Sequence, residues 1–146
     1  MSPGLARLVE IAPDIFPIDR PESLGVCTFC CMSKVREQEI LHQSRMGVSG
    51  NMLAEWLSSA FADNQKGRPT FTWLLPAIAK CLAQGEEPLS YGTELAFARA
   101  TRTGWPIHTW TTEQLDWVKS FALHLLTDRC DQELPLLDSY FCMFIT

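Results

Sequence analysis

Apolar side chains recur along this chain at helical spacing and rarely alternate with polar ones as they would in a strand. The clearest stretch is SGNMLAEWLSSAFAD, residues 49–63, in which Ser49 or Asn51 is placed to cap the first turn. Its apolar stripe consists of Met52, Leu53, Trp56, Leu57, Ala60 and Phe61. The stripe predicts an amphipathic helix.

A second helix is predicted after the polar stretch NQKGRP, residues 64–69, which we expect to be a loop. Its apolar face holds Leu74, Leu75, Ile78 and Leu82. Gly85 is placed to end this helix in a left-handed conformation. Pro76 either lies in the first turn or kinks the helix, because its ring nitrogen carries no hydrogen.

The strongest start signal lies at Thr111 and Gln114, whose spacing is that of a capping box. The helix predicted from there to residue 130 has a broad apolar surface: Leu115, Val118, Ala122, Leu125 and Leu126, widened by Trp117, Phe121 and His124. So broad a surface predicts a central helix with neighbours on two sides. After an acidic loop, a last helix is expected to carry Leu137, Tyr140, Phe141, Phe144 and Ile145 on one face.

Shorter helices are predicted near Leu5–Ile11, at Lys34–Gln43 and from Thr93 to about Arg102. Together these patterns predict an all-α protein without a significant sheet. We expect one domain over residues 1–146, in which about six helices pack as an irregular bundle. Residues 1–26 are expected to form a loosely structured lead-in.

Composition and charge narrow the function. Hydrophobic residues make up 47% of the 146-residue chain, which indicates a folded protein. The net charge of -5 disfavours binding to nucleic acid or to anionic membranes and favours a basic protein partner. The sequence has no long apolar run, and Glu10 and Asp14 interrupt its N-terminal part, so we expect a cytoplasmic protein with free thiols.

The stretch VCTFCCMSK places Cys27, Cys30 and Cys31 within five positions. A structural zinc site needs four ligands, commonly two pairs, and this stretch supplies one pair at the usual spacing. Cys31 and His42 are candidates for further ligands. Ordinary thiols are the favoured interpretation, with no metal and no other cofactor; a metal-binding or redox site at these cysteines is the alternative.

The order of motifs resembles a set of uncharacterised bacterial helical proteins. The motifs are the pair Cys27 and Cys30, Trp56 with Ser59 and Ala60, Phe71 with Leu74, Leu75 and Pro76, Gly85 with Glu86, Trp110 before Thr111, and Leu137 with Cys142. This chain departs from the pattern in the loop before the Leu-Pro helix and in ending soon after Cys142. The resemblance implies a small cytosolic accessory protein, and some related helical proteins are immunity proteins against contact-delivered toxins.

No group of residues forms a catalytic constellation, so we expect a protein that binds another protein and is not an enzyme. The leading hypothesis is an immunity or antitoxin-like protein that occludes the active site of a basic toxin. The charged contacts expected in this hypothesis are Glu86, Glu87, Asp131 and Glu133. An adaptor subunit of a larger assembly, or a homodimer, is a further possibility.

Overall fold

The computed structural model describes residues 1–59, 64–88 and 109–144, with side chains throughout except at 64–68 and 133–144. Within these ranges the chain forms five α-helices and one 3-10 turn, and no strand. The elements are α1 (Pro3–Ile15), α2 (Lys34–His42), η1 (the 3-10 turn, Arg45–Gly47), α3 (Gly50–Ser58), α4 (Asn64–Ala83) and α6 (Thr112–Phe144). The predicted all-α class is confirmed for this part of the chain. The helix predicted at 93–102 lies outside it.

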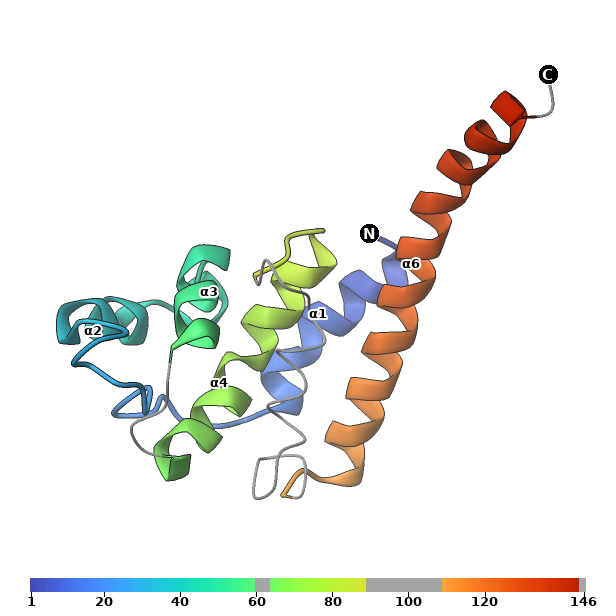
Figure 1. Ribbon diagram of the computed structural model, residues 1–146. Coiled ribbons are helices and arrows are strands. Elements are labelled where there is room, and N and C mark those ends of the chain that lie inside the picture. Colours follow the sequence, from blue (N-terminus) through green and yellow to red (C-terminus); the bar gives the residue numbers. More distant parts are fainter. Residues whose placement is uncertain (60–63, 89–108, 145–146) are drawn as a thin grey trace.

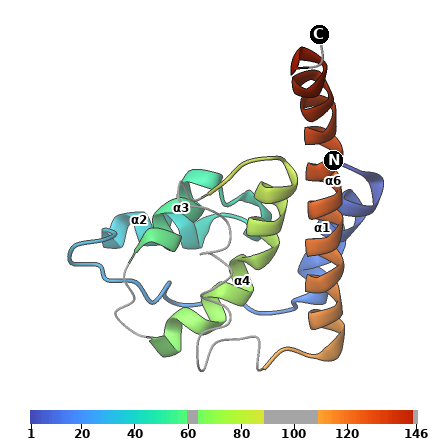
Figure 2. The ribbon, with the colours of Figure 1, turned by 45° about the vertical axis from the view of Figure 1, so that its right-hand side comes forward.

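The helices are arranged around α4, which contacts α1, η1, α3 and α6. Figures 1 and 2 show α1 and α6 on one side of α4, and α2 and α3 on the other. α6 runs beside α1 and then extends beyond the other helices (Figure 1). In the described part of the chain, no helix combines the length and the hydropathy required to cross a bilayer.

α4 forms the middle of the core. From Thr70 to Ala83 its side chains are all buried except that of Lys80, and the predicted apolar face is therefore confirmed. The loop predicted at 64–69 is wrong, because α4 already begins at Asn64 and contains Pro69. A proline this near the start of a helix removes only one hydrogen bond close to the helix end, and the buried segment that follows stabilises the helix.

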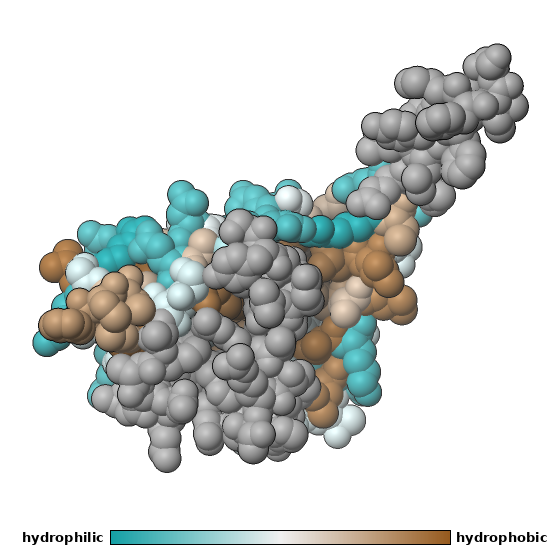
Figure 3. Space-filling model, viewed as in Figure 1, coloured by the Kyte–Doolittle hydropathy of each residue, from teal (hydrophilic) through white to brown (hydrophobic). Residues whose placement is uncertain are grey.

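α6 begins as predicted, since Thr111 and Gln114 exchange two hydrogen bonds of 3.0 and 3.2 Å in a capping box. Trp117 and Phe121 are buried, but Ala122 is exposed. The predicted central position of this helix is wrong, because α6 packs along one face and leaves the opposite face in solvent (Figure 3).

The break predicted in the acidic stretch after residue 130 is also wrong, because α6 continues to Phe144. Pro135 lies within this helix. A proline inside a helix lacks one backbone hydrogen bond, but its fixed φ matches the helical value. One missing bond does not end a helix of 33 residues.

The first helix differs from the predicted lead-in at residues 1–26. α1 is regular, and the hydroxyl of its N-cap residue Ser2 accepts a hydrogen bond from the backbone N–H of Leu5. Leu5, Ala12 and Phe16 are fully buried. The beginning of the chain is thus part of the core.

One guanidinium group joins α1, η1 and α4. Arg45 donates to four backbone carbonyls, those of Phe16 and Trp73 at 2.6 Å, Thr72 at 2.9 Å and Pro13 at 3.4 Å. Two of these carbonyls lack a helical donor: Pro76 follows Thr72 by four positions, and Pro13 lies in the last turn of α1, beyond which Pro17 has no N–H to donate. Burial lowers the pKa of Arg45 to about 10. We call this group of bonds the Arg45 joint; it replaces hydrogen bonds that the prolines remove.

Trp110 connects the start of α6 to the same core. Its ring packs edge-on against Phe16 at a centroid distance of 5.5 Å and lies 6.4 Å from the ring of Phe71. Its indole N–H donates to the hydroxyl of Thr72 at 3.1 Å. Both the apolar body and the polar tip of this side chain are therefore used within the fold.

Candidate metal centre

Residues 27–31, which we call the cysteine turn, connect two buried residues. Val26 precedes the turn and is 4% exposed, and Met32 follows it and is 5% exposed. The chain reverses because the backbone N–H groups of Cys31 and Met32 both donate to the carbonyl of Cys27, at 3.3 and 3.2 Å. The turn is thus fixed at both ends, while its side chains from Phe29 to Cys31 are exposed and those of Cys27 and Thr28 are half-buried.

A buried carboxylate fixes the segment that leads into the turn. Glu37 of α2 accepts the backbone N–H of Leu24 at 2.8 Å and the hydroxyl of Ser23 at 2.9 Å. The indole N–H of Trp56, in α3, donates to the carbonyl of Leu24 at 3.2 Å. Both polar backbone groups of Leu24 are therefore satisfied by side chains of helices that follow the turn.

Two local features set the direction of the chain around the turn. Gly25 has a φ of 72°, in the left-handed region that glycine adopts without strain. On the other side, the hydroxyl of Ser33 accepts the N–H of Arg36 at 3.1 Å and caps α2. The cysteine turn therefore ends directly at a helix start.

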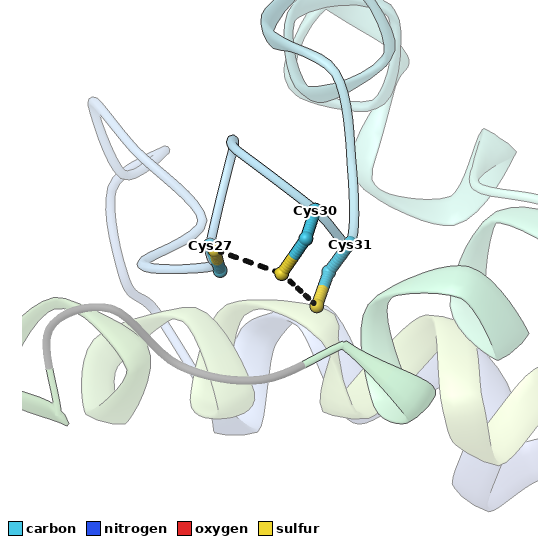
Figure 4. Close-up of side chains that lie close together, drawn as sticks. All are labelled: Cys27, Cys30 and Cys31. Carbon is cyan, nitrogen blue, oxygen red and sulfur yellow. Dashed lines mark hydrogen bonds between the residues drawn. The ribbon is translucent and has the colours of Figure 1, made fainter.

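The three sulfur atoms of the turn converge, as Figure 4 shows. The Sγ atoms of Cys27 and Cys30 are 3.4 Å apart, those of Cys30 and Cys31 are 3.6 Å apart, and all three lie within 4.8 Å of one another. Four thiolates around zinc, each at about 2.3 Å, lie roughly 3.8 Å apart in a tetrahedron. One ion can therefore reach ligand distance from all three sulfurs after only small movements.

Exposure and backbone hydrogen bonds suit this cluster to metal binding. Cys30 and Cys31 are exposed and Cys27 is half-buried, so an ion can enter from solvent. The pKa of Cys27 is lowered because the backbone N–H groups of Cys30 and Phe29 donate to its sulfur. The pKa of Cys30 is raised to about 11 by its hydrogen bonds to the sulfurs of Cys27 and Cys31. The backbone thus favours the thiolate of Cys27, the form that binds metal, whereas the neighbouring sulfurs favour the thiol form of Cys30.

Of the ligands considered from the sequence, the structure brings together the three cysteines of the turn and leaves out His42. Cys31 belongs to the cluster, although it directly follows Cys30. His42 is not part of it; its Nδ1 donates to the carbonyl of Gln38 in its own helix, at 2.6 Å. A set made only of thiolates favours soft metal ions such as Zn²⁺ and Cu⁺.

The predicted contact residues Glu86 and Glu87 make bonds within the protein. The thiol of Cys81 donates to a carboxylate oxygen of Glu86 at 3.5 Å, and burial together with this carboxylate raises the pKa of Cys81 to about 12. Glu87 forms an ion pair with Arg129 of α6 at 2.9 Å. Both glutamates also line a pocket of about 380 Å³ at the start of α3.

The other two predicted contacts do not lie in a loop. Asp131 and Glu133 both belong to α6, which corrects the prediction of an acidic loop at this place. Asp131 is exposed, whereas the side chain of Glu133 lies outside the described part of the structure. The structure thus attaches the loop of Glu87 to α6 two residues before Asp131, through Arg129.

The histidines and cysteines not yet described lie outside the cysteine turn. His124 is half-buried and its Nδ1 donates to the carbonyl of Ser120 at 2.8 Å, a satisfied structural histidine. Cys130 is exposed on α6. His108 and the side chain of Cys142 lie outside the described residues.

Sequence reasoning missed the residues that hold the cysteine turn in place. Glu37 is only 7% exposed, and it lies one turn before the buried Ile40 on the same helix face. A carboxylate at an apolar position of a short helix is a signal of a buried polar contact. The signal does not identify the groups that donate to Glu37, because these groups, at Ser23 and Leu24, lie in a loop.

No protein-family model, curated protein or solved structure matches this chain. The resemblance to the uncharacterised bacterial helical proteins therefore stays a prediction.

Proposed function

We propose that this protein binds one soft metal ion, with Zn²⁺ as the first candidate, through the thiolates of Cys27, Cys30 and Cys31. The observation that supports the proposal is the convergence of the three sulfurs within 4.8 Å on a turn that is fixed at both ends. Flexible surface thiols that came together only by chance would not lie on a turn that is held at both ends. The anchored turn lowers the entropy that three separate ligands would lose on binding.

A reducing compartment is part of this proposal, because exposed neighbouring thiols persist only where disulfides are kept reduced. We therefore keep the cytoplasm as the proposed location. The proposal is for binding and assigns no catalysed reaction. On architecture, we also keep the proposal that about six helices form an irregular bundle.

The experiment is elemental analysis of tag-free protein purified under reducing conditions, followed by titration with Zn²⁺ against a chromophoric competitor. We expect one equivalent of zinc per chain. Cys27→Ser, Cys30→Ser and Cys31→Ser should each weaken binding, because each removes one thiolate from the set. Cys130→Ser is the matched control: it removes an exposed thiol outside the turn and should leave the stoichiometry at one.

The result that would contradict the proposal is a reduced, folded protein that takes up no stoichiometric metal. Binding that persists in all three single variants of the turn would also contradict it. Circular dichroism of each variant shows whether the helices are intact. A preference for Cu⁺ over Zn²⁺ would keep the site and change the ion.

The immunity-like function stays a prediction with less support. A basic partner at Glu87 would compete with the bond to Arg129, and at Glu86 it would compete with the contact to Cys81. The test is co-expression with a toxin encoded by a neighbouring gene. Failure to rescue the cells and to bind that toxin would remove this hypothesis, and it would leave metal binding untouched.

A further inference from the structure

We propose that the metal site of the cysteine turn is controlled by oxidation: Cys27 and Cys30 form a disulfide that excludes the metal ion. This inference rests on the proposed function for the role of the ion, but its chemistry rests on geometry. The two sulfurs are 3.4 Å apart in the reduced protein. Cys30 is exposed and Cys27 is half-buried, so a small oxidant reaches the pair from solvent.

The pairing of Cys27 with Cys30 is favoured over the neighbouring pair. Cys30 lies 3.6 Å from Cys31 as well, and it can bond to only one of the two. A disulfide between adjacent residues closes an eight-membered ring that distorts the intervening planar peptide bond. A disulfide between Cys27 and Cys30 spans two intervening residues and needs no such distortion.

The oxidant that we infer is a low-molecular-weight disulfide. The Cys27 thiolate attacks one sulfur of the oxidant, forms a mixed disulfide and releases one thiolate. Cys30 gives its proton to solvent and attacks the Cys27 sulfur, which forms the intramolecular S–S bond and releases the second thiolate. The two protein thiols thereby lose two electrons and two protons, and the oxidant leaves as two thiols.

The disulfide and the metal ion are mutually exclusive because both use the same electron pairs. Once Cys27 and Cys30 are joined, Cys31 is the one cysteine of the turn that still provides a thiolate. A single thiolate does not hold a zinc ion against competition from solvent and other ligands. Conversely, a bound ion occupies the sulfurs and slows their attack on the oxidant. The turn therefore has two alternative states, reduced with metal and oxidised without it.

The experiment uses the full chain with Cys130→Ser, which removes an exposed thiol that would cross-link chains. Metal-free and zinc-loaded samples are incubated with oxidised glutathione, trapped with an alkylating agent and analysed by peptide mass mapping. We expect a Cys27–Cys30 disulfide in the metal-free sample, slower formation in the zinc-loaded sample, loss of the single zinc equivalent on oxidation, and its return after dithiothreitol.

Several outcomes would overturn the inference. They are mixed glutathione adducts without an intramolecular bond, a disulfide between Cys30 and Cys31, or zinc binding that survives formation of the Cys27–Cys30 bond. Cys31→Ser is a second variant that retains the pair, and it should still form the disulfide. If the reduced protein takes up no zinc at all, the proposed function fails. Disulfide mapping of the metal-free protein still tests the exchange in that case.

Discussion

The Arg45 joint and the cysteine turn are two polar clusters that this fold treats in opposite ways. Arg45 is half-buried, and its guanidinium donates to four carbonyls of the surrounding helices. The cysteine turn instead presents Cys30 and Cys31 to solvent; it is fixed by backbone bonds to the carbonyl of Cys27 and by polar bonds in the flanking segment at Leu24. The comparison separates polar groups that complete the fold from polar groups that the fold presents to a ligand. Changes at the joint should therefore alter stability, whereas changes in the turn should alter binding.

The largest expected effect is that of Arg45→Met. Four buried or half-buried carbonyls lose a charged donor, and two of them have no helical donor because of the prolines. We expect the free energy of unfolding to fall by about 3 kcal/mol, as is typical when charge-assisted bonds to buried groups are removed. Urea denaturation followed by circular dichroism measures this loss.

The control for this variant is Arg20→Met. Arg20 also donates to a backbone carbonyl, that of Gln43 at 3.1 Å, but it is exposed. The change in unfolding free energy should stay within about 0.5 kcal/mol. Equal losses of unfolding free energy in the two variants would show that burial of the Arg45 joint adds nothing to stability. The folded Arg45→Met protein should still hold one equivalent of zinc, because the joint does not contact the turn.

A smaller loss of stability, together with a loss of zinc affinity, is expected for Glu37→Ala. The buried N–H of Leu24 and the hydroxyl of Ser23 lose their acceptor. The free energy of unfolding should fall by about 2 kcal/mol, the usual cost of an unsatisfied buried donor. Zinc affinity should fall as well, because the segment leading into the turn loses one of its fixed points. Denaturation and competitive zinc titration measure the two quantities.

Two companion variants sharpen this test. Gln38→Ala changes an exposed neighbour on the same helix and should alter neither quantity. Glu37→Gln keeps one side-chain oxygen as an acceptor and should recover part of both losses. A Glu37→Ala protein that is destabilised but binds zinc with unchanged affinity would show that the turn is fixed without this carboxylate.

The sequence predicted the parts of the fold that depend on nearby residues. The capping bonds at Ser49 and at Thr111 join atoms only three residues apart, and Gly85 ends α4 with a φ of 81°. The predicted breaks were wrong, because Pro69 and the rest of 64–69 lie inside α4 and α6 continues through the acidic stretch after residue 130. The bonds that compensate for a proline come from distant residues, as the Arg45 joint demonstrates.

The candidate site was predictable only in part, for the same reason. The spacing of Cys27 and Cys30 indicates a pair, because residues three positions apart in a turn place their side chains on the same side. Cys31 lies beside them because its backbone N–H donates to the carbonyl of Cys27. Glu37 holds the segment before the turn, and it does so from 13 residues away. The acidic contacts were inferred from charge alone. Charge does not reveal that Glu87 pairs with Arg129, which lies 42 residues later.

The smallest expected effect on stability is that of Phe29→Ser, at the tip of the turn. Phe29 is 98% exposed, so its ring contributes no burial to the folded chain. The free energy of unfolding should change by less than about 0.5 kcal/mol. Zinc stoichiometry should remain at one, because the backbone N–H that supports the Cys27 sulfur is retained. Denaturation at two protein concentrations provides the measurement. A loss that grows with concentration would show that Phe29 is buried against a second molecule, and the turn would then be a contact surface as well as a metal site.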